Sequence, residues 1–398
     1  MTITSTSDVY FDPYDVGINT DPYPVFRRLR EESPLYYNEA HDFYALSRFA
    51  DVERGLLDAA TYISGRGAIL ELIKAGIEMP PGILIFEDPP THTIHRRLLS
   101  RAFTSRRVNE LEGKIREFCA RSLDPLVGSG GFDLIAELGA QMPMRTIGLL
   151  LGIPEGDQEA IRDHVDSTLR TKAGEPMQVT SNFVTGEMFE EYIDWRAEHP
   201  SDDIMTELLQ AEFEDETGTV RRLTRNEVLT YVNVVAGAGN ETTTRLIGWA
   251  GTVLAAHPDQ RRQLVADRAL IPGAIEELLR YESPAPHVGR YMTQDMEHYG
   301  VTVPAGSAML FLIGAANRDD RRFPDGDRFD IHRQDGGHLT FSYGIHFCLG
   351  AALARLEGRV ALEELLARFP EWDVDLDNAR LSPTSTVRGW ETLRVRIP

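Results

Sequence analysis

The chain has 398 residues, with 41 Lys or Arg against 62 Asp or Glu, so its net charge at pH 7 is -21. This charge repels nucleic acid and anionic membrane surfaces, and we predict neither a nucleic-acid partner nor a membrane anchor. The start MTITSTSDVYFDPYD lacks the features of a signal peptide, and two cysteines far apart in the chain suit a reducing compartment. We therefore expect a cytoplasmic protein.

The N-terminal part combines one short helix with β-favouring segments. The segment DPYPVFRRLREESP predicts the helix, and PLYYNE and DFYALS predict strands on either side of the turn-like EAHD. We expect a β-rich part over about residues 1–60.

Helical patterns dominate from Pro89 onward. They cover HTIHRRLLSRAF, RVNELEGKIREFCARSLDPLV, LIAELGAQMPMRTIGLLLG, FVTGEMFEEYIDWRAEH, the stretch from Thr224 to His257, and Pro272 to Tyr281. Strand-like segments return near the end as HVGRYMTQD, VTVPAGSAMLFL and WETLRVRIP. We predict a mainly α fold with a minor β part, as one domain over 1–398, with a helical body over about 88–285 and a β-containing C-terminal part over about 286–398.

The stretch from Thr224 to His257 predicts a single helix that crosses the protein. It begins with a capping box, Thr224 with Glu227 three residues later. Its centre, AGAGNETTT, is poor in helix propensity. Small residues there allow either close helix packing, which is the commoner reason, or the approach of a flat ligand. The neighbouring Glu241 and Thr242 favour the ligand, since a buried carboxylate usually has a partner or a role.

A second unusual segment, FSYGIHFCLG, contains Cys348. Most cysteines in such places are small buried apolar residues. Here glycines permit tight turns, and a helix predicted from Leu349 directs its first amides at the sulfur, which favours a thiolate ligand. Zinc would need four ligands at short spacing, whereas haem needs one axial ligand. The other cysteine, Cys119, lies on an ordinary amphipathic pattern and receives no role.

This loop resembles the haem-ligand loop of the cytochrome P-450 superfamily, Phe-x-x-Gly-x-His/Arg-x-Cys-x-Gly. The matching residues are Phe341, Gly344, His346, Cys348 and Gly350, and Ser342 stands where glycine is more usual. Other segments are similar to further signatures of that family, in the same order: DPPTHTIHRRLLSRAF, AGNET (Ala238 to Thr242), ELLR (Glu277 to Arg280) and FPDGDRFD with Arg328.

The resemblance implies haem b held between the long central helix and the cysteine loop with its C-terminal helix, with Cys348 as the axial ligand of the iron. It implies that the haem propionates bind His92, Arg96, Arg290 and His346. It also implies cofactor contacts from Phe341, Gly350, Ala238 and Gly239.

The resemblance implies two further groups of residues. Thr242 and Glu241 would be the catalytic pair that delivers protons. Glu277, Arg280 and Arg328 would form a buried structural cluster.

The substrate pocket follows from the resemblance as well. The segment from Tyr62 to Phe86 would roof it, and its many Ile and Leu residues indicate a hydrophobic small organic substrate, although they also suit plain core. The pocket would be lined by Val234, Gly237, Ala238, Pro286, His287 and Val288. A structural role is the commoner one for a histidine such as His287.

The predicted activity is that of a haem-thiolate monooxygenase that hydroxylates its substrate with O2, with electrons from ferredoxin and ferredoxin reductase. An H2O2-driven peroxygenase and a non-enzymatic haem sensor or carrier are the alternatives, and the Glu241 and Thr242 pair favours the monooxygenase. A run of arginines without any acid lies between His92 and Arg107. We predict that an acidic ferredoxin contacts Arg101, Arg106 and Arg107, joined by Arg355 and Arg359.

Overall fold

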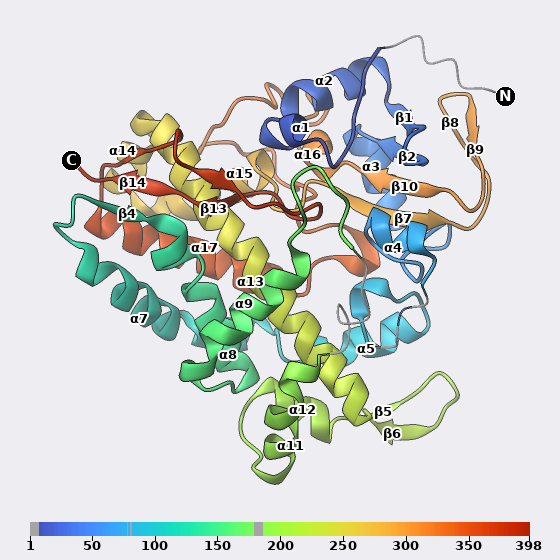
Figure 1. Cartoon of the computed structure of the whole chain (residues 1–398), viewed down its shortest axis with the longest axis horizontal. Helices are drawn as coiled ribbons and strands as arrows, with labels where there is room; N and C mark the ends of the chain where they lie inside the picture. The colour runs from blue at the N-terminus through green and yellow to red at the C-terminus, as the bar shows by residue number, and fades with distance from the viewer. Residues whose placement is uncertain (1–7, 78, 80–81, 179–185) are drawn as a thin grey trace.

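The longest helix, α13 (Arg225–Ala256), runs through the molecule, and the other elements are arranged around it (Figure 1). The computed structural model describes residues 8–77, 79, 82–178 and 186–398. The helix begins with the predicted capping box, in which Thr224 and Glu227 bond reciprocally. It continues without a break through AGAGNETTT, so the low helix propensity of this central segment does not interrupt the helix.

The helices that pack against α13 include α8 (Met142–Leu151), α9 (Gln158–Leu169), α15 (Ile271–Tyr281) and α17 (Ala351–Arg368). A π-helical turn, Ile135–Gly139, packs beside it too. The helix α17 also packs along α7 (Glu112–Leu123). Because α13 is covered on nearly all sides, its last turns from Leu246 onward are apolar on several faces, as the buried Leu246, Trp249 and Leu254 show.

The principal sheet has five strands in the order β1-β2-β10-β7-β3. They are β1 (Leu35–Asn38), β2 (Phe43–Leu46), β10 (Ala308–Phe311), β7 (Val288–Met292) and β3 (Tyr62–Ile63). The β2 and β10 strands are parallel, and the other pairs are antiparallel. All four residues of β10 are buried, as expected for a central strand covered on both faces.

Smaller elements complete the fold. A second sheet has the order β11 (Asp373–Val374), β14 (Arg394–Arg396), β4 (Gly131–Asp133). Three hairpins are β5 (Glu212–Glu214) with β6 (Val220–Arg222), β8 (Met296–His298) with β9 (Val301–Val303), and β12 (Arg380–Leu381) with β13 (Trp390–Thr392). The remaining α-helices are α1 (Val16–Thr20), α2 (Tyr23–Glu32), α3 (Phe49–Leu57), α4 (Leu70–Ala75), α5 (Thr91–Ser100), α6 (Ser105–Glu110), α11 (Glu190–Glu198), α12 (Ile204–Gln210), α14 (Pro258–Ala266) and α16 (Ile313–Ala316).

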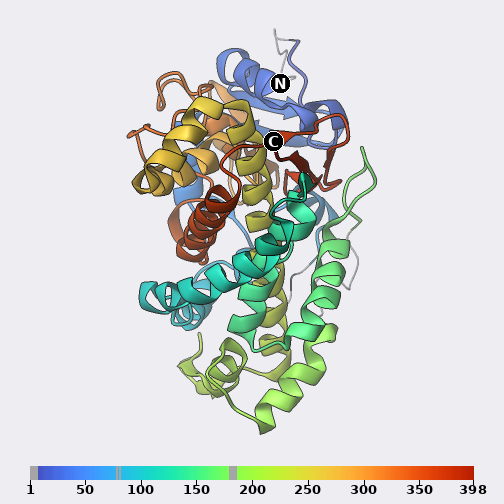
Figure 2. The ribbon, with the colours of Figure 1, turned by 90° about the vertical axis from the view of Figure 1, so that its left-hand side faces the viewer.

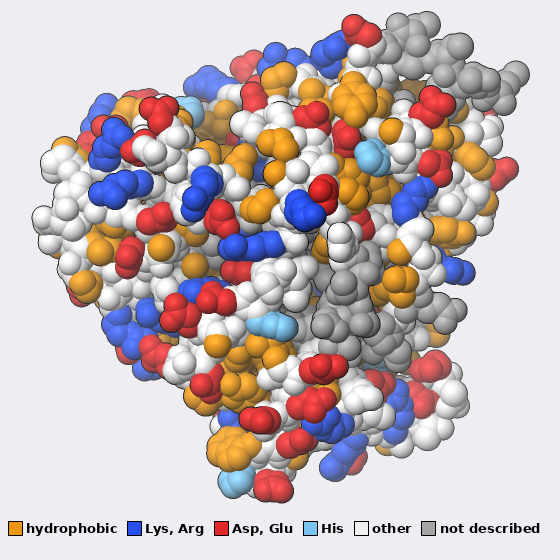
Figure 3. Space-filling view, viewed as in Figure 1, with side chains coloured by type: hydrophobic (Ala, Val, Ile, Leu, Met, Phe, Trp, Pro, Cys, Tyr) orange, Lys and Arg blue, Asp and Glu red, His pale blue; other side chains and the backbone are white. Residues whose placement is uncertain are grey.

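Both ribbon views (Figures 1 and 2) show the principal sheet and a group of helices at opposite ends of the molecule. The principal sheet lies at the upper end, and the helices α8, α11 and α12 lie at the lower end, with α13 spanning both (Figures 1 and 2). The prediction of a mainly α fold with a minor β part is confirmed. On the face drawn in Figure 3, acidic and basic side chains are interspersed. In the described part of the chain, no helix combines the length and the apolar composition that crossing a membrane requires.

Candidate active site

The cysteine loop folds back on itself just before α17. The amide of Cys348 donates to the carbonyl of Phe341 over 2.8 Å. Gly344 has φ +69°, and a Cβ there would lie 2.7 Å from the carbonyl oxygen of Leu56, so glycine is required. Ser342 also has a positive φ, +60°, which explains why glycine is more usual at this position in the resembling loops.

The sulfur of Cys348 lies at the start of α17. Burial raises the pKa of the thiol, while the backbone amide of Gly350 and the guanidinium groups of Arg96 and Arg355 favour the thiolate. A Cβ at Gly350 would meet no protein atom within 4 Å. Protein packing therefore does not require glycine here, whereas the close approach of a bound group would. A half-buried sulfur with helix amides and two arginines beside it is suited to bind a metal cation as thiolate.

Four basic side chains converge beside this loop: His92 and Arg96 from α5, Arg290 from β7, and His346. The rings of His92 and His346 are 4.5 Å apart. Both ring nitrogens of His92 and Nε2 of His346 are buried without a hydrogen-bond partner. Neither Arg96 nor Arg290 forms an ion pair with any residue in the described ranges, although Arg290 is buried.

The pKa values of these four basic side chains indicate that the cluster needs a negatively charged partner. Burial, followed by Arg290, lowers the pKa of His346 to about 3, and burial lowers the pKa of Arg290 to about 10. Burial lowers the pKa of His92 and of Arg96 as well. Buried cations and unpaired donors are unfavourable unless an anion completes them. The two propionates of the predicted haem would supply that charge, so the residues present fit the cofactor.

One face of α13 opens toward the same region. Val234, Ala238 and Thr242 recur every four residues and share this face. Ala238 is exposed although it lies at the middle of a helix that is otherwise largely buried, and Val234 and Thr242 are half-buried. The Thr242 hydroxyl donates to the carbonyl of Ala238 over 3.0 Å. A flat group could lie against the backbone at Ala238 because nothing larger than a methyl group projects there.

The adjacent glycine serves a different purpose. A Cβ on Gly239 would lie 2.5 Å from Cδ1 of Ile147 on α8. Packing of α13 on α8, rather than the predicted contact with a cofactor, therefore accounts for the glycine at this position.

Glu241 lies in a buried cluster of charged residues. Its carboxylate forms an ion pair with Arg245, one turn later on α13. From α9, the carboxyl of Asp166 lies in hydrogen-bonding contact with Glu241. The amide of Asn240 donates to Asp166 over 3.1 Å. Burial and the charge of Glu241 raise the pKa of Asp166 to about 7, so this carboxyl titrates near neutrality.

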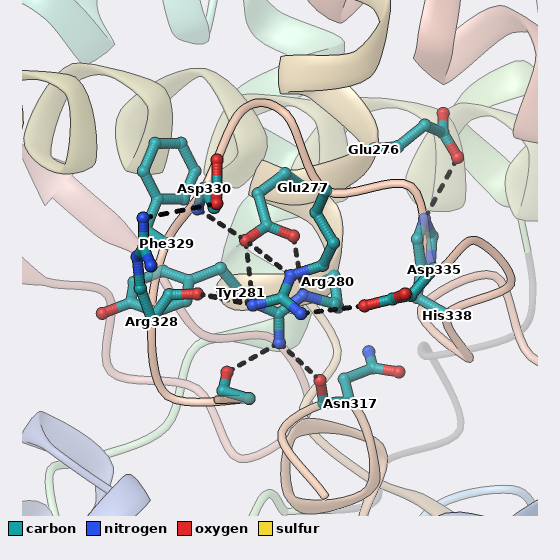
Figure 4. Close-up of polar contacts among 12 residues, drawn as sticks. Glu276, Glu277, Arg280, Tyr281, Asn317, Arg328, Phe329, Asp330, Asp335 and His338 are labelled. Atoms are coloured by element: carbon teal, nitrogen blue, oxygen red, sulfur yellow. Dashed lines mark hydrogen bonds and ion pairs between the residues drawn. The ribbon is translucent and has the colours of Figure 1, made fainter. Parts of the chain in front are cut away.

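The predicted structural cluster is correct for two of its three members. Glu277 and Arg280 are buried and joined by two hydrogen bonds, of 2.7 and 2.8 Å (Figure 4). The prediction for Arg328 is wrong: its side chain is 68% exposed and lies 3.5 Å from Asp330. Arg328 contributes only its carbonyl oxygen, which accepts from Arg280. The third member of the cluster is Arg333, whose guanidinium lies 3.3 Å from the carboxylate of Glu277.

The predicted pocket residues on β7 lie where its chain enters the sheet. Pro286, His287 and Val288 are half-buried, and burial lowers the pKa of His287. Within the predicted roof, residues 78 and 80–81 lie outside the described residues. The described part includes α4, whose Glu71 accepts from the amide of Met177 over 3.1 Å.

Most arginines of the predicted docking surface are already paired. Arg106 pairs with Glu110 and Arg107 with Asp202 and Glu207; Arg355 pairs with Glu276 and Arg359 with Glu112. Two exposed arginines at the end of α5, Arg97 and Arg101, form no ion pair within the described part of the chain. The positive charge available for a partner is therefore concentrated at these two residues.

Sequence reasoning missed four residues of this region. Arg245 could have been found from its spacing of four residues after Glu241. Glu357 could have been found because it falls within the apolar stripe of α17, where a charged residue is out of place. Asp166 and Arg333 carry no such signal, because only the fold brings them to their partners.

Comparisons with known proteins agree with this geometry. The sequence model of the family described as cytochrome P-450 matches residues 157–389. Cytochrome P-450 130 of Mycobacterium tuberculosis is 36% identical over 367 residues, covering 89% of each chain. Vitamin D(3) 25-hydroxylase of Pseudonocardia autotrophica is 35% identical over 406 residues, covering 100% of this chain and 99% of that protein. The solved structure of CYP109Q5 from Chondromyces apiculatus has a TM-score of 0.85 at 36% identity, covering 97% of this chain and 98% of that one.

A cysteine loop, a set of buried basic side chains without partners beside it, and an accessible face on a long helix are what a haem-thiolate protein needs. The chain belongs to the cytochrome P-450 family. It is a cytochrome P-450 monooxygenase with haem as its cofactor.

Proposed function

We propose that the protein hydroxylates a hydrophobic small organic molecule, with O2 as the oxygen source and with electrons from ferredoxin and ferredoxin reductase. The observation that carries the substrate class is the accessible face of α13, where Val234 and Ala238 offer only apolar groups. Two relatives support a bulky lipophilic substrate: one is named a vitamin D(3) 25-hydroxylase, and the structure of CYP109E1 from Bacillus megaterium is a complex with testosterone, at 27% identity and a TM-score of 0.84 over 96% of this chain and 99% of that one.

Each side chain of the site then has a defined task. Cys348 binds the haem iron, and His92, Arg96, Arg290 and His346 bind the propionates. Bound there, haem supplies the activation of dioxygen and the insertion of one oxygen atom, while the other leaves as water. Thr242 holds a proton at its hydroxyl on the accessible face of α13. Glu241, the preceding residue, brings protons to that position from the buried side of the helix.

The electron donor is proposed to dock at Arg97 and Arg101. These arginines lie on α5, the helix that also carries the propionate-binding His92 and Arg96, so a docked partner would be near the cofactor. A negative ferredoxin would meet the unpaired positive charge there despite the acidic chain as a whole. Free Cys119 and Cys348 suit the cytoplasm, where such electron carriers and reduced thiols occur together.

The ligand assignment is tested with the haem-loaded protein by the absorbance spectrum of the reduced, CO-bound form. The wild type is expected to show the red-shifted band of thiolate ligation, and Cys348→Ala is expected to lose it. Cys119→Ala is the matched control, because burial raises the pKa of that thiol to about 12 and keeps it a neutral core residue. A red-shifted band that persists in Cys348→Ala would overturn the assignment.

The reaction and substrate are tested in two steps. A panel of steroids, terpenoids, macrolides, fatty acids and aromatic acids is screened by the haem spin-state shift. Compounds that shift the spin state are then incubated with either ferredoxin, reductase and NADH or with H2O2 alone. Product formed only with the electron-transfer chain supports the proposal, and product formed equally well with peroxide alone would replace it by the peroxygenase.

A further inference from the structure

Two acids share one buried site directly beside Thr242. The side chain of Glu241 is 4% exposed, and the carboxyl of Asp166 lies in hydrogen-bonding contact with it. Two ionised carboxylates cannot form that hydrogen bond, because neither has a proton to donate. Two ionised carboxylates also repel each other in a buried site, so the proximity of the two acids favours one proton held between them.

The surrounding charges lead to the same conclusion. On α13, Arg245 forms an ion pair with Glu241, and its other terminal nitrogen donates to the carbonyl of Trp390. The charge of Arg245 also acts on Asp166, and more strongly than that of Arg162 on α9, which is engaged with Glu159 and Asp163 at 3.4 and 2.7 Å. The guanidinium of Arg245 is therefore the main positive charge beside two buried carboxyls, Glu241 and Asp166. A proton neutralises the second of the two carboxyls.

The placement of Asp166 connects this site with solvent. It is half-buried on α9, whereas the neighbouring Asp163 and His164 on the same helix are exposed. Asn240 holds it by a hydrogen bond of 3.1 Å. Three consecutive residues of α13 therefore have linked positions: Asn240 fixes the outer acid, Glu241 contacts it, and Thr242 lies on the accessible face.

We propose that Asp166 is the outer acid of the proton relay: it takes protons from water and passes them through the shared hydrogen bond to Glu241, which supplies Thr242. This inference rests on the proposed roles of Glu241 and Thr242. In each transfer Asp166 loses one proton to Glu241 and regains one from water, and no electron moves. Burial and the charge of Glu241 raise the pKa of Asp166 to about 7, so both of its protonation states are populated at the pH of turnover.

The test compares Asp166→Asn with Asp166→Glu and with Glu159→Gln. The last is the matched control, an acid on the same helix that is 74% exposed and whose partner Arg162 retains Asp163. With a substrate that shifts the spin state and the ferredoxin system, we expect Asp166→Asn to lower kcat by about tenfold or more, which is less than a direct general acid–base effect because Asp166 acts through Glu241. The wild-type kcat should fall as the pH rises through about 7. That decline should be absent in Asp166→Asn and shifted in Asp166→Glu.

A second readout requires no turnover. The difference between infrared spectra of resting haem-loaded wild type and Asp166→Asn, recorded across pH, should contain a protonated-carboxyl band that titrates near pH 7. The carboxyl of Glu357, whose pKa is about 8, is common to both proteins and cancels in this difference. The band should persist in Glu159→Gln, and substrate affinity by spin shift should be unchanged in all three variants. If Asp166→Asn does not fold, the shifted pH dependence of kcat expected for Asp166→Glu still tests the proposal.

The outcomes separate this inference from the proposed function. If Asp166→Asn retains the wild-type kcat, pH profile and infrared band, Asp166 is not in the relay, even where Thr242→Ala and Glu241→Gln behave as proposed. A rate that falls only together with substrate affinity and thermal stability would also overturn it, by assigning Asp166 a structural role. If Thr242→Ala and Glu241→Gln are themselves fully active, the relay as a whole fails.

Discussion

Thr243 donates a hydrogen bond to the carboxyl of Glu357 over 3.3 Å, and this contact joins α13 to the helix that follows the cysteine loop. Glu357 is 1% exposed, and its other oxygen is buried without a partner. Burial raises the pKa of this carboxyl to about 8. The acid is therefore mostly neutral at pH 7, and it faces the residue that follows Thr242.

The first prediction concerns Glu357→Gln. The folded protein holds this proton from the unfolded pKa of 4.5 up to about 8. Between these values the folded state binds more protons than the unfolded state, so the stability that Glu357 contributes is lost as the pH rises, by at most about 1.4 kcal/mol per pH unit. Glutamine has no such loss. Urea unfolding of both proteins from pH 5 to pH 8.5 should show the variant gaining stability relative to the wild type as the pH rises. A difference in the free energy of unfolding that does not change with pH would contradict this prediction.

The second prediction concerns the strained serine of the cysteine loop. Ser342 has φ +60°, and its hydroxyl is buried without a partner. Ser342→Gly should raise the free energy of unfolding by about 0.5–1 kcal/mol, because relief of left-handed strain exceeds the added entropy of the unfolded chain. The control is Ser342→Ala, which removes the hydroxyl but keeps the strain. Urea unfolding at a fixed haem excess measures both, and an equal gain from alanine would show that strain is not the cause.

The third prediction separates the two arginines of the Glu277 cluster. Arg333→Ala should lower the free energy of unfolding by about 1.5–3 kcal/mol, since it removes a charged partner from a buried carboxylate. Arg328→Ala should change it by less than about 0.5 kcal/mol, because that side chain is exposed. Both are measured by urea unfolding. A larger loss of unfolding free energy for Arg328→Ala would show that the Arg328 side chain does contribute to the cluster.

The fourth prediction concerns coupling of electron use to product. Thr242→Ala removes the hydroxyl that bonds to the carbonyl of Ala238. NADH consumption should continue, while the hydroxylated product falls by about tenfold or more and H2O2 appears in its place, because protons no longer arrive in the correct order. Glu241→Gln should instead slow NADH consumption and product together. Counting NADH, H2O2 and product in one assay distinguishes them, and full coupling in Thr242→Ala would exclude its role.

The fifth prediction concerns the electron donor. Reversing the charge of both Arg97 and Arg101 to Glu should raise the ferredoxin concentration for half-maximal turnover by about tenfold at low salt, with less effect at high salt. Substrate affinity should not change. Arg106→Glu is the control, because Arg106 is already paired with Glu110 and offers less free charge. Equal effects from the control would mean that the patch is not confined to the end of α5.

Local patterns predicted the elements with strong periodicity or capping. The capping box at Thr224 and Glu227 placed the start of α13 within one residue, because that motif consists of contacts between near neighbours. The amphipathic α9 was missed, and with it Asp166. The π-helical turn Ile135–Gly139 also lay inside a segment predicted as ordinary helix.

Long-range contacts explain where prediction from sequence failed. Arg328 and Arg333 lie in the same loop and have the same chemistry, and only the path of that loop decides which one reaches Glu277. Likewise, the sequence predicts a docking surface that includes Arg107 and Arg355, but these pair with Asp202, Glu207 and Glu276, which lie far from them along the chain. That the chain forms a single domain stays a prediction, as do the functional roles of the site residues.

The contact between Gly239 and Ile147 has a practical consequence for redesign of substrate selectivity. At position 239 any side chain would meet Ile147 on α8, so every substitution there requires Ile147 to shift. Position 234 is half-buried on the accessible face and tolerates new side chains that project toward the substrate, whereas position 238 must stay small where the flat cofactor would lie. Pairing substitutions at Gly239 with a smaller residue at Ile147 would reopen that position, as a coupled pair of sites rather than two independent ones.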